Sequence, residues 1–431
     1  MMRTHYTSDI TPEMGGETVT LAGWTHELRD IGKIKFLVLR DRSGTIQVTA
    51  KRGVVSDEVM DSIDFVKETV VQVEGEVVAG KGAKAGIEII PSKVTVLAPV
   101  STTIPFEVTG KVPVELDVRL DNRYIDLRRK ETAAIFKIRS VLEGAFREKL
   151  VGLGFQEITP PSIVASATEG GTSLFKVKYF ENDAFLAQSP QLYKQLAVIG
   201  GMDKIFMTSP IFRAEKHNTS AHLNEILQMD IEMGFGDHND AMDILAEVGV
   251  HLISKAKEEC PKELEVLKRE LKVPDKVTRY TYTEVLEQLN RAGSRLEWGD
   301  DFSKEDERKM PSVLGEEMFL ITEWPTEIRA FYSMPTKDDQ KKCNAYDLMY
   351  GGMEIASGAQ RIHIPELLIQ QLKNRGLNPD NFEFYTRAFR MGAPPHAGWS
   401  IGLERITMMI CGVSNIRECS LFPRDRTRLT P

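Results

Sequence analysis

The stretch FRAEKHNTSAHLNEILQMD, residues 212–230, decides how the rest of the chain is interpreted. Its charged part lies between two apolar runs, 205–207 and 226–229, and this order predicts a strand, a charged loop and a second strand. Arg213 and His222 belong to that loop. Because a guanidinium offers two N–H donors in a rigid fork, the stretch predicts a site for phosphate or carboxylate. An ordinary solvated hairpin is the alternative at this point.

Length and composition indicate a globular protein with roughly two or three domains, since the chain has 431 residues, 42% of them hydrophobic. The formal net charge of -8 argues against a protein that is basic overall, although a local basic patch can still bind nucleic acid. The four cysteines lack metal-type spacing, and no apolar segment suits a signal peptide or a membrane span. We therefore expect reduced thiols, no membrane association and a cytoplasmic protein.

The N-terminal part predicts a small closed barrel such as the OB-fold. Residues 18–98 alternate short β-rich runs with turns, and one helical segment is expected near 57–65. Between residues 27 and 52, seven basic residues stand against three acidic ones, and Phe36 lies among them. Such a surface favours single-stranded nucleic acid, whereas a lone aromatic is more often barrel core. We expect this domain in 1–100, a linker in 101–130 and a second domain in 131–431.

The second domain mixes helices and strands. Residues 130–150 have helical period, and GFQEITPPSI, residues 154–163, predicts an edge strand stopped by a proline pair. The glycine-containing loop 167–175 carries Glu169 and could close over a ligand. We interpret residues 237–345 as a helical elaboration with a solvated charged face.

Two later segments return to a strand, a glycine-rich turn and a helix: 345–361 and 398–410. In the first, Glu354 and Ser357 could offer oxygen ligands to Mg²⁺. In the second, Arg405 lies on the helix. The chain has no GxxxxGK[ST] motif, which argues against P-loop chemistry.

Taken together, these segments resemble the three signature motifs of class II aminoacyl-tRNA synthetases. The helix into GFQEITPPSI is similar to the first motif, which forms the dimer interface in that family, FRAEKHNTSAHLNE to the second and GWSIGLERI to the third. Their order, with QSPQLYK and SGAQR between them, is specific, and the barrel places the chain in the subclass for aspartate, asparagine and lysine. The resemblance implies an α+β multidomain fold, with an N-terminal OB-fold barrel and a catalytic domain built on an antiparallel β-sheet flanked by helices.

Within that subclass the chain resembles the aspartate-specific enzymes of archaeal and eukaryotic type, which lack a large bacterial insertion. Lys194 and Arg361 would put two positive groups at the amino-acid pocket, and a neutral amide would leave a buried cation unpaired. The implied reaction is ATP-dependent activation of L-aspartate to aspartyl-adenylate, followed by transfer to the 3′ end of tRNA-Asp. Asparaginyl relatives lack the lysine of QLYK.

The resemblance also implies a role for each residue of the ATP site. Arg213 would contact the α-phosphate, and Arg405 would stack on adenine and reach the γ-phosphate, which makes these two the expected catalytic residues. Glu215 would lie near the adenine, His222 near the terminal phosphates, and Glu354 with Ser357 would bind Mg²⁺. The expected aspartate-binding residues are Glu169, Gln191, Lys194, Asp230 and Arg361. Ile226 occupies a position that is aromatic in many relatives, so one side of the adenine site would be aliphatic.

In the barrel, Phe36, Gln47 and Glu88 match residues that stack on and read the central anticodon bases. Archaeal members that charge only tRNA-Asp tend to have tryptophan where this chain has His26. The resemblance therefore implies relaxed specificity, with aspartate placed on both tRNA-Asp and tRNA-Asn. It implies a homodimer as well, while the sequence does not identify an amidotransferase partner for Asp-tRNA-Asn.

Three other functions compete with this interpretation. An asparaginyl-tRNA synthetase is disfavoured by Lys194. A non-catalytic tRNA-binding paralogue is disfavoured by the joint presence of Arg213, Glu354, Ser357 and Arg405. A free-standing ligase that works through an adenylate would not need a barrel with Phe36.

Overall fold

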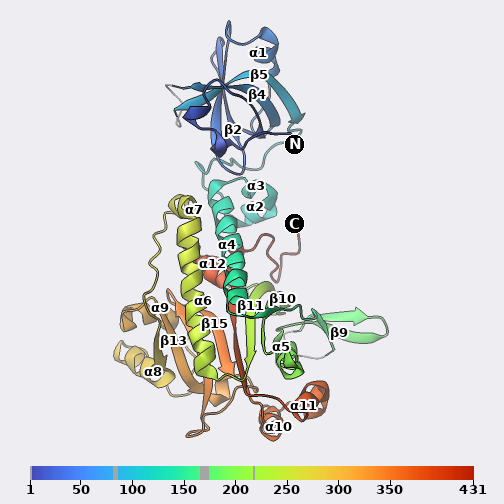
Figure 1. Cartoon of the computed structure of the whole chain (residues 1–431), viewed down its shortest axis with the longest axis vertical. Coiled ribbons are helices and arrows are strands. Elements are labelled where there is room, and N and C mark those ends of the chain that lie inside the picture. Colours follow the sequence, from blue (N-terminus) through green and yellow to red (C-terminus); the bar gives the residue numbers. More distant parts are fainter. Residues whose placement is uncertain (1, 81–85, 166–173, 217–218) are drawn as a thin grey trace. The chain divides into compact units, whose positions relative to one another are not determined.

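The chain folds into two compact units, Met1–Ala133 and Ala134–Pro431 (Figure 1). The structure is a computed structural model, and it describes residues 2–80, 86–165, 174–216 and 219–431. Within these ranges no helix combines the length and the apolar character that a membrane span requires.

The first unit contains a closed five-stranded barrel in the order β1-β2-β3-β5-β4, which confirms the predicted OB-type fold. Every second side chain of β2 points inward, so Leu37 and Leu39 are fully buried. Phe36 lies on the outer face of the same strand and is only half-buried. The strands are β1 Thr18–Asp30, β2 Ile34–Arg40, β3 Thr45–Lys51, β4 Val70–Ala79 and β5 Ile87–Ala98, and helix α1 spans Asp57–Ser62. The segment that we predicted as a linker contains two short helices, α2 Leu116–Asp121 and α3 Arg123–Asp126.

The second unit is built on an eight-stranded sheet in the order β12-β13-β14-β15-β16-β11-β10-β6. All neighbouring strands are antiparallel except the two edge pairs, β12 with β13 and β10 with β6. This confirms the antiparallel sheet flanked by helices. The strands are β6 Gln156–Glu157, β10 Lys204–Phe212, β11 Glu225–Gly234, β12 Thr278–Thr281, β13 Met318–Pro325, β14 Lys342–Tyr350, β15 Met353–Gln360 and β16 His396–Gly402. A separate three-stranded sheet has the order β7-β9-β8, from Ile163–Val164, Asn182–Leu186 and Lys176–Tyr179.

The prediction that residues 237–345 are a helical elaboration is wrong in one respect. The segment does contain α6 His238–Glu259, α7 Pro261–Val266, α8 Tyr282–Arg291 and α9 Lys304–Leu314, but it also supplies β12, β13 and part of β14. Strand β13 is buried along most of its length, so its sequence lacks the alternation of polar and apolar residues that marks a half-exposed strand.

One face of the sheet carries the main core and leaves the other face for a site. Helices α4 Lys130–Gly152 and α6 lie along the sheet in Figure 1, and their apolar side chains share one core cluster with β11 and β16. Met229 and Ile231 of β11 belong to that core, so Asp230 and Glu232 point to the opposite face. The remaining helices are α5 Gln191–Ala197, α10 Pro365–Asn374, α11 Glu383–Phe389 and α12 Leu403–Cys411.

Candidate functional site

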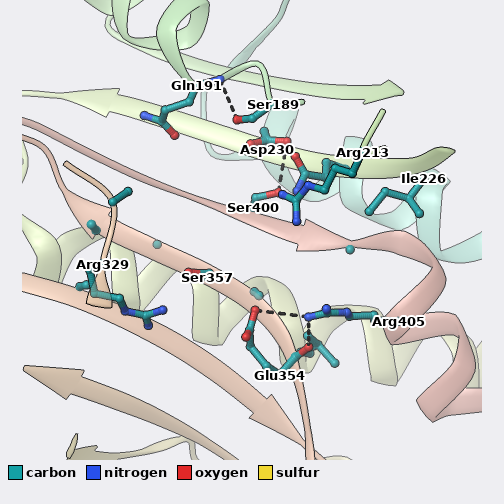
Figure 2. Close-up of a pocket in the computed structure, with 18 of the residues that line it drawn as sticks. Ser189, Gln191, Arg213, Ile226, Asp230, Arg329, Glu354, Ser357, Ser400 and Arg405 are labelled. Atoms are coloured by element: carbon teal, nitrogen blue, oxygen red, sulfur yellow. Dashed lines mark hydrogen bonds and ion pairs between the residues drawn. The ribbon is translucent and has the colours of Figure 1, made fainter. Parts of the chain in front are cut away.

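A polar cavity of about 360 Å³ lies on the sheet face that carries Asp230. Its walls come from β11, β15 and β16, from the start of α5 and from α12, as Figure 2 shows for the labelled side chains. Segments far apart in the sequence therefore meet here, including the charged hairpin predicted from residues 212–230. That hairpin exists, because β10 and β11 pair in continuous antiparallel register from Phe212 opposite Glu225 onward.

One end of the cavity, which we call the buried end, is lined by Lys194, Asp230 and Arg361, and Glu232 completes their ionic cluster by pairing with Lys194 and Arg361. The Lys194 Nζ atom lies 2.9 Å from an oxygen of Asp230 and 3.5 Å from an oxygen of Glu232. Arg361 donates two hydrogen bonds to the Glu232 carboxylate, from Nε at 2.9 Å and from Nη2 at 3.2 Å. Each of the four side chains is at most 4% exposed. The formal charges of the cluster sum to zero.

The sheet geometry explains how this cluster fits. Glu232 stands opposite Gly398 in the β11–β16 ladder, and a Cβ atom at Gly398 would come within 2.3 Å of the Glu232 carboxylate. Burial tends to raise the pKa of Glu232, but Arg361 and Lys194 outweigh it, and the pKa lies below its ordinary value. For Asp230, burial dominates over Lys194, and the pKa is raised.

Gln191 is held beside this cluster by a chain of hydrogen bonds. Its Nε2 donates to Gln195 Oε1 at 2.9 Å, and the Tyr385 hydroxyl donates to the same oxygen at 2.9 Å. The Gln195 amide nitrogen lies 2.8 Å from His396 Nε2, and His396 Nδ1 lies 2.7 Å from the Pro394 carbonyl oxygen. The side-chain oxygen Oε1 of Gln191 has no hydrogen-bond donor among the described residues, so it can accept a hydrogen bond from a ligand.

The buried end changes the electrostatic argument made from the sequence. We expected Lys194 and Arg361 to be cations that only a substrate carboxylate could pair. In the structure both already have carboxylate partners, Asp230 and Glu232, because charges buried this deeply are not left unpaired. Contrary to the expectation from the sequence, an amide ligand would therefore not leave a buried cation with no partner.

The opposite end, which we call the open end, carries Arg213, Glu215, His222, Glu354 and Arg405. Arg213 extends from the β10–β11 side and Arg405 from α12 (Figure 2). Arg405 Nη1 donates to the Glu354 carbonyl oxygen at 3.0 Å and lies 3.4 Å from its carboxylate. Within the described ranges, the Arg213 guanidinium has no hydrogen-bond or ion-pair partner. Burial and the nearby arginines lower the pKa of His222, while Glu215 opposes them.

Asn224 holds the two ends of the charged loop together, a function that the sequence did not suggest. Its side-chain Nδ2 donates to the Arg213 carbonyl oxygen at 2.6 Å and to the Glu215 carbonyl oxygen at 3.2 Å. The backbone N–H of Arg213 in turn donates to the Asn224 carbonyl oxygen at 2.9 Å. This clamp fixes where the Arg213 side chain leaves the hairpin.

Oxygen atoms suited to a divalent cation gather at β14 and β15. Asp347 stands opposite Ser357 in the ladder, and Glu354 follows the bulge of the same pair of strands. Asp347 Oδ1 is buried and has no partner among the described residues, while Arg329 pairs with Oδ2. Burial raises the pKa of Asp347 to about 7, with Arg329 opposing the rise and Glu354 adding to it. A buried carboxylate oxygen without a partner among the described residues fits a hard cation such as Mg²⁺, whose charge would favour the ionised form.

The structure thus brings together all of the predicted aspartate and ATP residues that it describes. Glu169 lies outside the described residues. Besides Asn224, sequence reasoning missed several residues of this site, among them Ser189, Glu232, Arg329, Asp347 and Ser400. Glu232 follows Asp230 at strand spacing, which was the available signal, whereas Arg329 is reached only through the fold.

The predicted anticodon residues lie on the outer face of the barrel. Gln47 Nε2 donates to a Glu88 carboxylate oxygen at 2.8 Å, and Thr49 Oγ1 binds the same oxygen at 2.5 Å. Phe36 stands opposite Thr49 in the β2–β3 ladder, beside this pair. His26 lies farther along the same face, next to Arg40.

Comparison with known proteins gives one family for most of the chain. Residues 115–426 match the family described as tRNA synthetases class II (D, K and N), and residues 19–97 match the OB-fold nucleic acid binding domain. The chain is 51% identical to a Methanopyrus kandleri protein named aspartate--tRNA(Asp/Asn) ligase, over the full length of both.

Two solved structures are also similar to it. The asparaginyl-tRNA synthetase of Pyrococcus horikoshii complexed with asparaginyl-adenylate has a TM-score of 0.95 and 33% identity, with both chains covered completely. The aspartyl tRNA synthetase of Entamoeba histolytica has a TM-score of 0.89 and 32% identity, covering 99% of this chain and 93% of that one.

Proposed function

Because the chain belongs to the class II tRNA synthetases for aspartate, lysine and asparagine, we propose that it activates L-aspartate with ATP and transfers it to tRNA-Asp and tRNA-Asn. The observation that carries the choice of amino acid is the buried end. It offers both a carboxylate, Asp230, and a cation, Lys194, to a zwitterionic ligand. The full-length relative that is 51% identical bears the name of the same activity.

Aspartate binding would break the ion pair between Lys194 and Asp230 and form two ion pairs between the protein and the substrate. The substrate ammonium would take Asp230 and the Gln191 carbonyl oxygen, and its side-chain carboxylate would take Lys194 and the remaining N–H groups of Arg361. Asparagine could make the same ammonium contact with Asp230, but its neutral side chain offers Lys194 no carboxylate. Its binding would therefore break the Lys194–Asp230 ion pair without giving Lys194 a new one. The loss of this ion pair, rather than an unpaired cation, therefore favours aspartate over asparagine.

The first chemical step is attack of the aspartate α-carboxylate on the α-phosphorus of ATP. An oxygen–phosphorus bond forms, the bond to pyrophosphate breaks, and aspartyl-adenylate results. The attacking carboxylate is already ionised, so this step needs no general base and depends on positioning and charge neutralisation. Arg213 is the cation best placed to bind the α-phosphate, because Asn224 fixes its backbone and no carboxylate holds it within the described ranges.

Arg405 and His222 would bind the β- and γ-phosphates. Mg²⁺ would be held by Glu354 and Ser357, with Asp347 as a further oxygen ligand, and when bound it supplies positive charge to the phosphates. Glu215 would lie at the adenine, beside Ile226. In the second step the terminal ribose hydroxyl of tRNA attacks the adenylate carbonyl carbon and AMP leaves.

Amino-acid-dependent exchange of pyrophosphate into ATP tests the substrate. We expect exchange with aspartate and at least a hundredfold less with asparagine, in line with rejection of a ligand that lacks one charged contact. Equal or greater exchange with asparagine would overturn the proposal in favour of an asparaginyl enzyme, the function named for the Pyrococcus structure.

Charging of two transcripts tests the tRNA specificity. Purified tRNA-Asp and tRNA-Asn transcripts should accept aspartate with kcat/KM values within about tenfold of each other. A much lower value for tRNA-Asn would show a discriminating enzyme. If both are charged, the Asp-tRNA-Asn product needs an amidotransferase to become Asn-tRNA-Asn, and such an enzyme would act after this one.

The working unit is proposed to be a homodimer in the cytoplasm, where ATP and tRNA are available. A groove beside α4 presents partly exposed apolar side chains, among them Leu421 and Phe422, which are 43% and 40% exposed. Light scattering should give twice the 48.5 kDa mass of one chain. A monomeric mass at micromolar concentration would contradict this assembly.

A further inference from the structure

His26 stands at an irregular position of the barrel. The β1–β2 register shifts between Thr25 and Glu27, so His26 is the extra residue of a β-bulge. A bulge turns a side chain away from the direction that regular pairing would give it. Here the imidazole meets Arg40 of β2, whose Nη1 lies 2.7 Å from His26 Nδ1.

Arg40 is itself firmly held. It donates to both oxygens of Glu68, at 3.0 and 2.7 Å, and Arg128 donates to the same carboxylate at 2.9 Å. Arg40 and Glu68 are 8% and 6% exposed. Glu68 has a φ of 67°, in the left-handed region, and its backbone N–H donates to the Thr25 carbonyl oxygen at 2.7 Å. The carboxylate is therefore placed by a specific backbone turn, and Arg40 has little freedom to move.

This arrangement determines which nitrogen of His26 carries the proton. A guanidinium can only donate, so Nδ1 must be the acceptor and Nε2 must carry the hydrogen. In the part of the chain that is described, Nε2 has no partner, and the side chain is half-buried. Burial and then Arg40 lower the pKa of His26; Lys67 acts in the same direction, and Glu68 and Glu27 against it. His26 thus offers a fixed N–H donor at neutral pH.

The donor lies on the same face of the barrel as Phe36, Gln47 and Glu88. Phe36 and Arg40 are four residues apart on β2 and so share one face, at about 13 Å along the strand. A single strand whose base stacks on Phe36 would present a neighbouring base near His26. Aspartate and asparagine codons differ only in their first base, so the two anticodons differ only in their last, which is cytosine or uracil.

We propose that Arg40 and Glu68 are positioning residues for tRNA specificity: they fix His26 as an Nε2–H donor that binds the 2-oxo group of the last anticodon base. Cytosine and uracil have opposite donor and acceptor patterns at positions 3 and 4, and they share an acceptor only at O2. One fixed donor can therefore serve both bases at O2 alone. This inference rests on the proposed function, because it explains how both tRNAs are accepted.

The test uses tRNA-Asp and tRNA-Asn assembled with 2-thiocytidine or 2-thiouridine as the last anticodon base, since sulfur is a weak hydrogen-bond acceptor. With the unaltered protein we expect kcat/KM for charging to fall at least fivefold for both thiolated tRNAs. The variant His26→Ala should charge the oxygen and sulfur forms equally, within twofold.

Two variants of Arg40 separate positioning from barrel stability. Arg40→Met removes the donor to Nδ1 and should abolish the difference between oxygen and sulfur forms. Arg40→Lys keeps a donor and should retain at least half of it. Lys93→Met removes an exposed ion pair with Glu74 on the same unit, outside the basic segment 27–52, and should behave like the unaltered protein. Pyrophosphate exchange, which does not involve tRNA, should be unchanged in the variants of Arg40 and in the control variant.

The outcomes distinguish the inference from the proposed function. If the unaltered protein charges only tRNA-Asp, the relaxed specificity fails and the inference with it. If it charges both but ignores the sulfur substitution, only the inference is overturned. It is also overturned if Arg40→Met keeps the full fivefold effect. If Arg40→Met does not fold, Glu68→Gln, which keeps the shape of the side chain, replaces it with the same expected loss.

Discussion

The charged side chains at the two ends of the pocket differ in how deeply they are buried and in whether they are paired. At the buried end, all four ionic side chains are at most 4% exposed and each is already paired with another. At the open end, Arg405 and Glu354 are 24% and 33% exposed, and Arg213 has no partner within the described residues. Water can solvate the second set before a ligand arrives, but it cannot solvate the first set.

Because of this difference, we expect the buried end to determine substrate specificity and the open end to determine catalysis. Buried charges must be compensated within the protein, so the buried end is preorganised and a ligand has to match it group by group. The open end can keep uncompensated positive charge, which a triphosphate neutralises on binding. Substitutions at the buried end should therefore damage both folding and activity, whereas those at the open end should damage activity alone.

Lys194→Met gives the largest expected effect. It leaves Asp230 without its ion-pair partner in a site that water does not reach, so the free energy of unfolding should fall by about 3–5 kcal/mol. Aspartate-dependent pyrophosphate exchange should become undetectable. Urea denaturation and exchange assays on the same preparation measure the two effects.

The double variant Lys194→Met with Asp230→Leu is the matched control. Removing both partners should recover much of the lost stability while exchange stays absent. If Lys194→Met is as stable as the unaltered protein, the buried end is not preorganised by this ion pair and the comparison between the two ends fails.

Arg213→Ala should have the next largest effect, and on activity only. Because its guanidinium makes no hydrogen bond or ion pair with any described residue, the urea midpoint should stay unchanged. Loss of one preorganised donor to the reacting phosphate should lower kcat for pyrophosphate exchange about 100- to 1000-fold. Normal exchange would show that another residue binds the α-phosphate.

Asp347→Asn tests whether the open end includes the oxygen ligands of β14 and β15. The change replaces a carboxyl group beside Glu354 with an amide but keeps the size of the side chain. The Mg²⁺ concentration for half-maximal exchange should rise about 10- to 100-fold, the usual range when the surroundings of a metal ligand are altered. The exposed change Asp57→Asn, in the other unit, is the control and should leave the Mg²⁺ dependence unaltered.

The two ends also differ in how far the sequence alone predicts them. The β10–β11 hairpin with Arg213 and His222 follows from a local pattern, as does the barrel with its alternating strands. The partners of Lys194 do not, because Glu232 becomes a partner only when α5 and β11 pack together. Strand β13 was missed for a related reason, since burial on both faces removes the polar alternation.

Asp347 shows the same limit at the open end. In sequence it is one acidic residue in an apolar run, and its position opposite Ser357 depends on the register of two paired strands. A register shift by one residue would move it to the other face of the sheet. Ligand sets that form across a ladder therefore need the fold, while ligands within one loop can be predicted from spacing.

Ile226→Phe is expected to have the smallest effect, and it acts at the open end. Ile226 lies in β11 opposite Ile211, and its half-buried side chain lines the same cavity as Arg405. An aromatic ring here could stack on one face of adenine, which is worth about 0.5–1.5 kcal/mol beyond the buried area. The KM for ATP should then fall about 2- to 10-fold, while the KM for aspartate stays the same because the buried end is untouched. Ile226→Leu, which adds no ring, should leave both constants unchanged. A rise in the KM for ATP would mean that the larger side chain obstructs the adenine and that Ile226 defines the width of the open end.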